Sequence, residues 1–200
     1  KIAYEINKNF LEVILAKGFD KESLEILKRK KNLRIIDISN FKIKNILSIK
    51  SFSGSFLLQS KDNIVLDRKK LKCVTKLKPN KKELAEIQFA FNVCKHVKSN
   101  AIVLCNNFST IGIGAGQPSR LDSCKIAVQK AKQFQFSKIK NCIAASDAFF
   151  PFADGIKTLI KAGVKTIVQP GGSIRDQEVI NEADKAKVKM LFTGIRHFNH

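Results

Sequence analysis

Short apolar runs alternate with amphipathic segments through the second half of the chain. Four runs have the length and continuous hydrophobicity of buried strands: residues 101–105, 142–146, 165–169 and 188–192. Three segments with helical spacing lie between them: residues 119–134, 153–162 and 174–186. Strands that alternate with helices in this way predict an α/β fold with a largely parallel core sheet.

A further helix is expected before the first of these strands, at residues 80–97. Asn80 and Glu83 have the spacing of a capping box, in which each side chain bonds the backbone N–H of the other residue. Apolar side chains then follow at helical spacing and predict one buried face: Leu84, Ile87, Phe91 and Cys94. His96, near the end of this helix, is expected at the surface.

The first 80 residues have shorter and less regular elements. Four of them are expected in order: a helix within Lys1–Phe10, a strand at Leu11–Ala16, a helix capped by Asp20 and ending near Arg29, and a strand at Leu33–Ile38. Two β-like pieces, Ile46–Ile49 and Phe56–Gln59, lie on either side of Ser53-Gly54, and Lys69–Pro79 is expected to be an exposed connector. The first helix has no cap and no initiator methionine precedes it, which predicts that the chain starts inside a longer protein.

Two of the predicted strands are followed by segments whose residue types suggest a binding site. The run that closes at Ser146 is followed by Asp147 and by three aromatics around Pro151: Phe149, Phe150 and Phe152. The run that closes at Gln169 is followed by Pro170-Gly171-Gly172-Ser173, a turn expected to offer free backbone N–H groups. Because open α/β sheets bind ligands at the carboxyl ends of their strands, both segments are expected to line one crevice. Aromatic faces beside a glycine turn favour a planar, polar, anionic ligand.

Composition narrows the class of protein. The chain has 37 lysines and arginines against 17 acidic residues, a formal net charge of +20, which would suit a nucleic-acid binder. Only six of the basic residues are arginines, the usual readers of bases, and the lysines are scattered, so nucleic acid is not the expected partner. No apolar stretch has the ~18 residues of a membrane span.

The cysteine and histidine content bears on the redox state of the thiols and on metal binding. Five cysteines without a CxxC pair indicate buried, reduced thiols in a cytoplasmic protein. Three histidines give little material for a metal site, and none is predicted.

Several single features stay open between two interpretations. Gly112, Gly114 and Gly116 do not have the spacing of a dinucleotide fingerprint, and they are interpreted as a glycine-rich turn that lets backbone approach a ligand or a packed helix. The carboxylates Glu12, Asp147 and Asp154 favour capping or solvated-edge roles over acid–base work. Phe149 and Phe152 taken alone favour core positions over ligand platforms. Arg196 is either a phosphate ligand or a surface charge.

Taken together, the longer motifs resemble one family. They are Lys95–Val103 (KHVKSNAIV), Ile111–Arg120 (IGIGAGQPSR), Ser146–Gly155 (SDAFFPFADG), Gln169–Asp176 (QPGGSIRD) and Thr193–His200 (TGIRHFNH), with Phe10–Phe19 and Lys72–Lys76 in the same register. The chain resembles the C-terminal part of the bifunctional purine biosynthesis family. That family joins an inosine monophosphate (IMP) cyclohydrolase to an aminoimidazole carboxamide ribonucleotide (AICAR) formyltransferase.

The resemblance implies a transformylase domain of two cytidine-deaminase-like units, each a three-layer α/β/α arrangement with a mixed, largely parallel sheet and no zinc. Residues 1–80 would hold the end of the first unit and the connecting segment, and residues 81–200 the second unit. The implied reaction passes a formyl group from the co-substrate 10-formyltetrahydrofolate to the 5-amino group of AICAR, and the cyclohydrolase domain closes the product to IMP. The implied protein is a cytoplasmic homodimer with its sites near the subunit interface.

The resemblance also implies roles for single residues. The nucleotide-binding positions are Glu12, Asn100, Arg120, Phe149, Phe152 and Arg196, with Asn100 also supporting catalysis at the transfer point. The folate-binding positions are Leu121, Asp154, Ser173 and Ile174. Arg196 would pair with the phosphate, and Phe149 and Phe152 would flank the flat rings.

The family's proton-transfer pair has no counterpart in this chain. It is a lysine and a histidine in a KHxNPCG-like motif, and none of the three histidines matches it. The substrate amine is a poor nucleophile that needs a base and oxyanion stabilisation, so the segment alone is expected to be inactive. Pro118 and Ala153 depart from the family pattern and concern fine folate or interface contacts. The alternative is a basic α/β module that binds nucleotides or RNA without catalysis.

Overall fold

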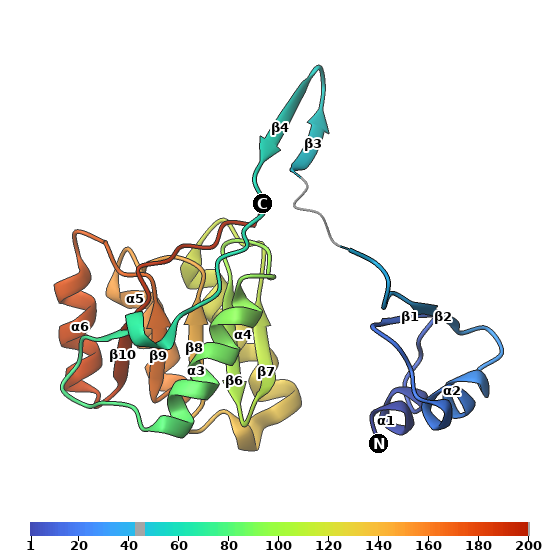
Figure 1. Cartoon of the computed structure of the whole chain (residues 1–200). Helices are drawn as coiled ribbons and strands as arrows, with labels where there is room; N and C mark the ends of the chain where they lie inside the picture. The colour runs from blue at the N-terminus through green and yellow to red at the C-terminus, as the bar shows by residue number, and fades with distance from the viewer. Residues whose placement is uncertain (43–46, 200) are drawn as a thin grey trace. The chain divides into compact units, whose positions relative to one another are not determined.

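The computed structural model describes residues 1–42 and 47–199, and its contacts divide the chain into two compact units, Lys1–Lys61 and Asp62–His200 (Figure 1). This boundary lies earlier than residue 80, because the segment after Asp62 packs with the second unit. The expected division at residue 80 concerned the two halves of the family's transformylase domain and stays a prediction.

The first unit contains two parallel strands and two helices in the predicted order. Its elements are α1 (Ile2–Asn7), β1 (Val13–Ala16), α2 (Lys21–Lys28) and β2 (Arg34–Asp37). Asp20 caps α2 as predicted, because its Oδ1 accepts the Ser23 N–H at 2.7 Å. A small core of Ala3, Ile26 and Leu27 joins the helices.

A hairpin of β3 (Ser48–Phe52) and β4 (Ser55–Gln59) completes this unit, and its turn lies at Ser53-Gly54, as the sequence indicated. Gly54 has φ +77°, a conformation that side chains rarely adopt. Ile46, which was expected to begin the first of these strands, lies outside the described residues.

The second unit is built on one six-stranded sheet with the order β5-β10-β9-β8-β6-β7. Its strands are β5 (Lys72–Cys73), β6 (Ile102–Asn106), β7 (Ser109–Gly114), β8 (Ile143–Ser146), β9 (Thr166–Gln169) and β10 (Lys189–Phe192). Its helices are α3 (Lys81–Cys94), α4 (Arg120–Gln135), α5 (Ala153–Ala162) and α6 (Asp176–Lys185), with short 3-10 turns at Arg68–Lys70 and Phe136–Lys138. The α/β class and the four long apolar strands are confirmed.

The prediction of a largely parallel sheet is correct only for its centre. The strands β8, β9 and β10 run parallel, whereas β6 pairs antiparallel with both β8 and β7, and β5 pairs antiparallel with β10. Two of these strands were missed in the sequence. The segment expected to be an exposed connector supplies β5, and the segment expected to be a glycine turn supplies most of β7.

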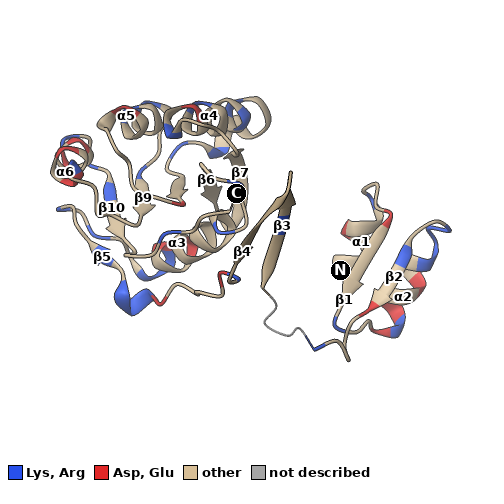
Figure 2. Cartoon of the chain, turned by 90° about the horizontal axis from the view of Figure 1, so that it is seen from above, with Lys and Arg blue, Asp and Glu red and all other residues tan. Residues whose placement is uncertain are grey.

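Helices cover both faces of this sheet and make three layers. Figure 2 shows α3 on one face and α4, α5 and α6 on the other. The face under α3 buries Ile87, Ala90 and Phe91 of the helix, and the predicted capping box of Asn80 and Glu83 begins it. The opposite face holds the larger cluster, which includes Ile156 and Val179.

Two glycines of β7 explain why this strand escaped prediction. A Cβ on Gly112 would lie 2.1 Å from the carbonyl oxygen of Ala127, and a Cβ on Gly114 would lie 1.9 Å from that of Ser123. Both carbonyls belong to α4. The glycines therefore serve close packing of a helix on a strand, which is one of the two interpretations that the sequence left open, and they do not form a turn.

Four of the five thiols are buried, as predicted, and Cys73 is half-buried. Burial raises the pKa of Cys105, Cys124 and Cys142 to about 12, so these thiols are inert near neutral pH. Within residues 1–42 and 47–199, no helix has the length and apolar character needed to cross a membrane. In the same residues, histidine, cysteine and acidic side chains do not gather in threes that could hold a metal ion.

Candidate functional site

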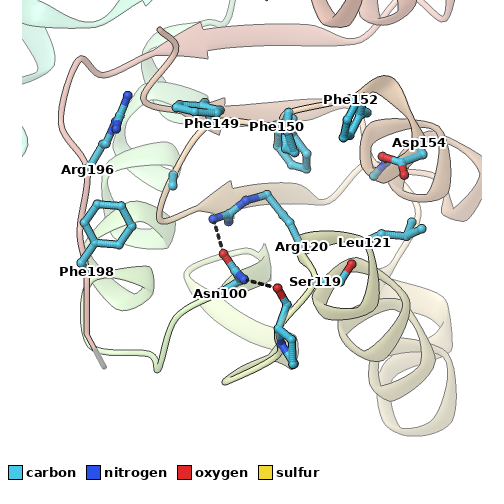
Figure 3. A pocket seen from close by; sticks show the side chains of 14 residues that line it. Asn100, Ser119, Arg120, Leu121, Phe149, Phe150, Phe152, Asp154, Arg196 and Phe198 are labelled. Atoms are coloured by element: carbon cyan, nitrogen blue, oxygen red, sulfur yellow. Dashed lines mark hydrogen bonds between the residues drawn. The ribbon is translucent and has the colours of Figure 1, made fainter. Parts of the chain in front are cut away.

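A pocket of about 460 Å³ opens at the edge of the sheet where β8 ends (Figure 3). Because β6 runs antiparallel to β8 and Ile102 pairs with Ser146, the start of β6 lies at this same edge. The N-terminus of α4, the loop after β8 and the segment after β10 complete the walls. Seven predicted site residues line the pocket: Asn100, Arg120, Leu121, Phe149, Phe152, Asp154 and Arg196.

A second hollow of about 440 Å³ adjoins the first and shares Phe149, Phe152 and Arg196 with it. Ser173 and Ile174, two predicted folate positions, line this hollow. The loop after β9 therefore meets the loop after β8, as expected from strands that end at one edge. Two recesses that share an aromatic wall suit two ligands that must approach each other.

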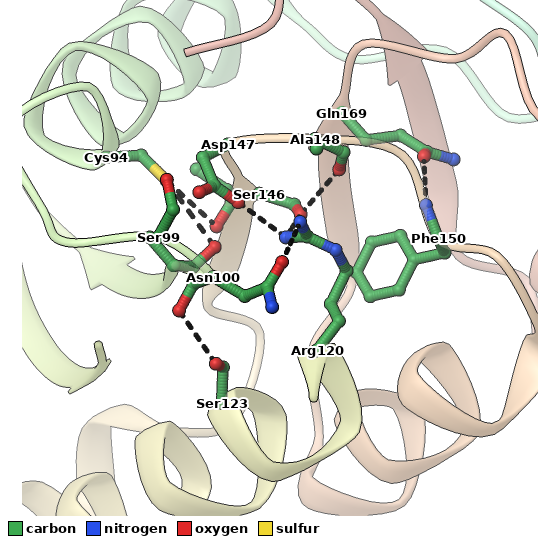
Figure 4. Close-up of polar contacts among 12 residues, drawn as sticks. Cys94, Ser99, Asn100, Arg120, Ser123, Ser146, Asp147, Ala148, Phe150 and Gln169 are labelled. Atoms are coloured by element: carbon green, nitrogen blue, oxygen red, sulfur yellow. Dashed lines mark hydrogen bonds and ion pairs between the residues drawn. The ribbon is translucent and has the colours of Figure 1, made fainter. Parts of the chain in front are cut away.

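Arg120 lies at the bottom of the pocket and is held by the protein itself. Its Nη1 donates to the Ser146 Oγ at 2.7 Å and to the Asp147 Oδ1 at 2.5 Å, and its Nη2 donates to the Asn100 Oδ1 at 2.8 Å (Figure 4). Three of its five N–H groups are thus used internally, and the residue is only 8% exposed. The remaining N–H groups are what it can offer to a ligand.

Asn100 is fixed just as firmly. Its Nδ2 donates to the carbonyl oxygens of Gln117 at 2.8 Å and Pro118 at 3.1 Å, while its Oδ1 accepts from Arg120. These partners set the orientation of the amide, because two carbonyls can face only the NH₂ side. Asn100 can therefore accept one further hydrogen bond, whereas donating to a ligand would cost it a protein partner.

Asp147 has a role that the sequence did not indicate. It was expected to cap a helix or to sit at a solvated edge, but it is fully buried and forms an ion pair with Arg120. Its backbone oxygen accepts the His197 N–H at 2.9 Å. Its Oδ2 is buried and has no hydrogen-bond partner among the described residues. The carboxylate therefore balances the charge of Arg120 inside the protein.

Arg196 differs from Arg120 in every one of these respects. Its side chain is exposed, and its guanidinium carbon lies 4.7 Å from the centre of the Phe149 ring. Among the described residues it forms no ion pair with a carboxylate. A cation over an aromatic face, without a counter-ion, is available to an anionic ligand.

The three aromatics after β8 all line the first pocket but differ in burial. Phe150 is buried, and its N–H donates to the Gln169 Oε1 at 2.9 Å. Phe152 is 49% exposed, and Arg175 lies over its ring at 4.7 Å. Phe149 and Phe152 line both hollows, whereas Phe150 lines the first pocket from a buried position.

Asp154 and Leu121 lie on the outer part of the pocket wall. Asp154 is exposed in the first turn of α5, and its Oδ1 accepts the Gly155 N–H at 2.6 Å. Its other carboxylate oxygen is open to a donor from a ligand. Leu121 adds apolar surface beside it from the first turn of α4. The helix begins after Ser119, as predicted, although the Ser119 side chain makes no capping hydrogen bond.

The glycine turn after β9 is less open than its sequence suggested. Gly171 and Gly172 have φ of +74° and +93°, and a Cβ on Gly171 would lie 2.4 Å from the Phe192 ring. The Gly172 N–H was expected to be free, but it donates to the Asp176 Oδ2 at 2.6 Å. The glycines are therefore required by backbone conformation and packing rather than by exposed N–H groups.

Glu12 lies in the first unit, between α1 and β1, and is exposed. Its carbonyl oxygen accepts the Arg34 N–H at 2.9 Å, which ties it to the neighbouring strand. The positions of the two units relative to each other are not defined, so its predicted contact with the nucleotide stays a prediction.

Sequence reasoning missed two further parts of the site. Phe198 lines the pocket beside Arg196, and Ser146 accepts from Arg120 while its own hydroxyl donates to the Ala148 carbonyl at 2.7 Å. Phe198 lies in the same terminal motif as Arg196, two positions on, so alternation along an extended segment would have indicated it. Ser146 gives no such signal, because a serine at a strand end is common.

Comparison with solved structures finds only a distant likeness. A structure of Acinetobacter baumannii RibD, form 1, matches 53% of this chain and 33% of its own, with 17% identity and a TM-score of 0.37. A likeness at this level does not establish the fold.

Curated proteins give a much stronger match, and all those described here are named bifunctional purine biosynthesis protein PurH. The protein of Aquifex aeolicus is 46% identical over 99% of this chain, that of Bartonella tribocorum 49% over 99%, and that of Thermoanaerobacter sp. 48% over 100%. In each case the chain spans 38% of the relative's length. A family model described as AICARFT/IMPCHase bienzyme matches residues 1–130. The resemblance seen in the motifs is thereby confirmed, and the chain belongs to the AICARFT/IMPCHase bienzyme family.

Proposed function

We propose that this chain carries the nucleotide- and folate-binding walls of an AICAR formyltransferase site. In the proposed reaction the 5-amino group of AICAR receives a formyl group, for which 10-formyltetrahydrofolate is the donor when bound. The family and the names of its relatives support this class of chemistry. The two adjoining hollows support a reaction between two ligands.

The observation that carries the proposal is the charge of Arg196 above Phe149, which has no carboxylate partner in residues 1–42 and 47–199. Every other guanidinium near the pocket has a carboxylate beside it: Arg120 has Asp147, and Arg175 has Glu178 at 3.6 Å. A phosphate at Arg196 would supply the missing anion, and the adjacent ring would stack on the flat base. Arg120 and Asn100 lie on the same pocket wall, where they can meet the polar groups of the nucleotide.

The second hollow and the wall near Asp154 are proposed for the folate. The free oxygen of Asp154 can accept hydrogen bonds from an amino edge of a pterin, and Leu121 and Ile174 offer apolar contact. Phe152, shared by both hollows, would then separate or stack the two ring systems.

Proton transfer is proposed to depend on residues outside this chain. Neither a lysine nor a histidine lines the pocket within the described residues. Asp154 is the one carboxylate on its wall among those residues, and it is exposed and accepts the Gly155 N–H. We therefore propose that the remaining part of the transformylase supplies the lysine and histidine, that the active protein is a homodimer in the cytoplasm, and that a cyclohydrolase domain closes the product to IMP.

Calorimetric titration of the chain with AICAR and with its unphosphorylated nucleoside tests the binding proposal. We expect the nucleotide to bind about 30-fold or more tightly, since a charge-assisted phosphate contact contributes about 2 kcal/mol. Arg196→Ala should remove most of this preference, whereas Arg29→Ala, an exposed arginine of the first unit, should not. Equal affinities of the wild-type chain for the two compounds would refute the proposal.

A formyl-transfer assay tests the division of labour. The chain alone should show no turnover, and the family's full-length protein should be active. Robust turnover by the chain alone would show that its own residues perform the proton transfer. The alternative, a basic module for RNA or nucleotides, predicts binding that ignores AICAR and falls steeply with salt.

A further inference from the structure

The segment after β10 alternates between the pocket and the protein interior. Arg196 and Phe198 both line the pocket, whereas His197, between them, is only 2% exposed. An extended chain places alternate side chains on opposite sides, so the position of His197 determines where its two neighbours point. Contacts that fix the His197 side chain therefore also fix the direction in which the Arg196 side chain points.

Three contacts hold His197 from three directions. Its ring packs against Phe91 of α3, with the ring centres 4.8 Å apart. Its Nδ1 forms a short hydrogen bond with the Asp62 carboxylate. Its backbone N–H donates at 2.9 Å to the carbonyl oxygen of Asp147, the residue whose carboxylate pairs with Arg120. The His197 side chain thus joins α3 to the segment before the first 3-10 turn, and its backbone adds the loop after β8.

Asp62 is itself a fixed anchor rather than a mobile surface charge. Its Oδ1 accepts the Ile64 N–H at 3.1 Å and lies 3.6 Å from the Lys95 Nζ. Burial alone would raise the pKa of its carboxyl, but the hydrogen bond from His197, the Ile64 N–H and the charges of His197 and Lys95 outweigh it and lower the pKa. The carboxylate is therefore charged at neutral pH and can hold the imidazole N–H.

We propose that His197 and Asp62 are positioning residues that keep Arg196 and Phe198 directed into the pocket. This inference rests on the proposed function, in which Arg196 binds the phosphate of the nucleotide. The pair touches no ligand, and neither residue lines the pocket. Its effect is to fix, before binding, a segment that would otherwise lose conformational freedom when the ligand arrives.

Two substitutions test the hydrogen bond between His197 and Asp62 from its two sides. His197→Phe keeps a ring against Phe91 and removes the Nδ1–H, and Asp62→Ala removes the acceptor. Each should weaken AICAR binding about tenfold, as expected for loss of one charge-assisted hydrogen bond, and should leave the affinity for the unphosphorylated nucleoside nearly unchanged. The double variant should lose little more than either single variant, because both remove the same bond.

The charge of Asp62 makes the second variant a sharp test. Removing a negative charge near the site would by simple electrostatics strengthen the binding of an anion. Weaker binding by Asp62→Ala therefore reports lost positioning and not an altered field. Asp122→Ala, which removes an exposed carboxylate from α4, is the matched charge control, and His96→Phe, at an exposed histidine, is the matched ring control. Neither control should weaken AICAR binding.

A conservative variant and a second measurement complete the design. His197→Asn offers an amide N–H close to the former Nδ1 and should recover part of the affinity lost in His197→Phe. Hydrogen exchange should show that the backbone N–H groups of residues 195–199 exchange faster in His197→Phe than in the wild-type chain.

The outcomes distinguish this inference from the proposed function. A wild-type chain with no preference for the nucleotide over the nucleoside refutes the proposed function, and hydrogen exchange then still decides about the positioning. If the preference exists but survives in both His197→Phe and Asp62→Ala, or if residues 195–199 keep their protection in His197→Phe, the positioning role is refuted.

Discussion

Two regions of the same pocket use arginine in opposite ways. The pocket floor, made of Asn100 and Arg120 with Ser146 and Asp147 behind them, is a buried network in which the guanidinium has a carboxylate, a hydroxyl and an amide as partners. The pocket rim, made of Phe149, Phe152, Arg196 and Phe198, has an exposed guanidinium that lies over an aromatic ring and forms no ion pair with a described carboxylate.

The difference assigns the two regions to different tasks. A buried charge must be paired within the fold, because an unpaired one costs several kcal/mol. An exposed charge is solvated by water, so it needs no partner within the fold and is available to a ligand. We therefore expect changes in the pocket floor to lower the stability of the protein and changes in the pocket rim to lower its affinity.

The largest effect is expected for Asp147→Asn in the pocket floor. The substitution keeps the shape of the side chain but leaves the buried Arg120 without its counter-charge. Breaking a buried pair from one side costs about 3–5 kcal/mol, so the free energy of unfolding should fall by about that amount. Urea denaturation followed by circular dichroism measures it.

The control for this change is Asp122→Asn, at an exposed carboxylate whose partner Lys125 lies 3.3 Å away. It should change the free energy of unfolding by no more than about 0.5 kcal/mol. A loss below about 1 kcal/mol for Asp147→Asn would mean that the stability of the pocket floor does not depend on its ion pair.

The next largest effect is expected from Gly114→Ala, which acts on the pocket floor through α4. The new Cβ would lie 1.9 Å from the Ser123 carbonyl oxygen, so α4 must move away from β7. Overpacking of this kind costs about 1–3 kcal/mol, and the shift would also displace Arg120 at the start of the helix. Urea denaturation checks the stability. Gly116→Ala has no such clash, because the nearest atom is 3.7 Å from its new Cβ, and it therefore shows what backbone strain at φ +66° costs without a clash.

The sequence predicted the elements of this fold well where hydrophobic runs were long. The strands β8, β9 and β10 and the helices α5 and α6 lie within one or two residues of their predicted bounds. It failed at the two edge strands for physical reasons. The strand β5 has two residues and depends on pairing with β10, and β7 contains glycines whose purpose is visible only when α4 lies against them.

The residues of the candidate site were predicted more from the motifs of the family resemblance than from the hydrophobic pattern. The ends of β8 and β9 marked the loops that line both hollows, because strand ends at one edge are a property of topology. What the sequence could not show is which polar groups satisfy one another. Asp147 was expected at a solvated edge, but its partner Arg120 comes from a helix 27 residues earlier in the chain. The Gly172 N–H was expected to be free, but the local turn brings the Asp176 carboxylate to it.

A smaller effect, with a defined pH dependence, is expected where the pocket rim is anchored. The pKa of Asp62 is lowered from its ordinary value of 3.8, so its contacts stabilise the folded chain fully above that value and are lost as the pH falls through the lowered folded pKa. Asp62→Ala should therefore reduce the free energy of unfolding by about 1 kcal/mol at pH 7.

The difference between the two proteins should shrink as the pH falls below the ordinary Asp pKa of 3.8, because the wild-type carboxyl becomes protonated as the pH passes through its lowered folded pKa. Glu83, whose pKa is also lowered, is present in both proteins and cancels in the difference. Urea denaturation at pH steps measures it. A difference that stays constant with pH would show that Asp62 stabilises the chain by packing and not by its charge.

The smallest effect on stability is expected for Arg196→Ala at the pocket rim. The exposed guanidinium loses only its contact with the Phe149 ring, and such contacts contribute about 0.5 kcal/mol at exposed sites. The free energy of unfolding should therefore stay within about 0.5 kcal/mol of the wild-type value, while the affinity for AICAR falls. A stability loss approaching that of Asp147→Asn would mean that Arg196 is held by the fold as Arg120 is. Its guanidinium would then be paired within the fold and not available to a phosphate, and the contrast between pocket floor and pocket rim would not hold.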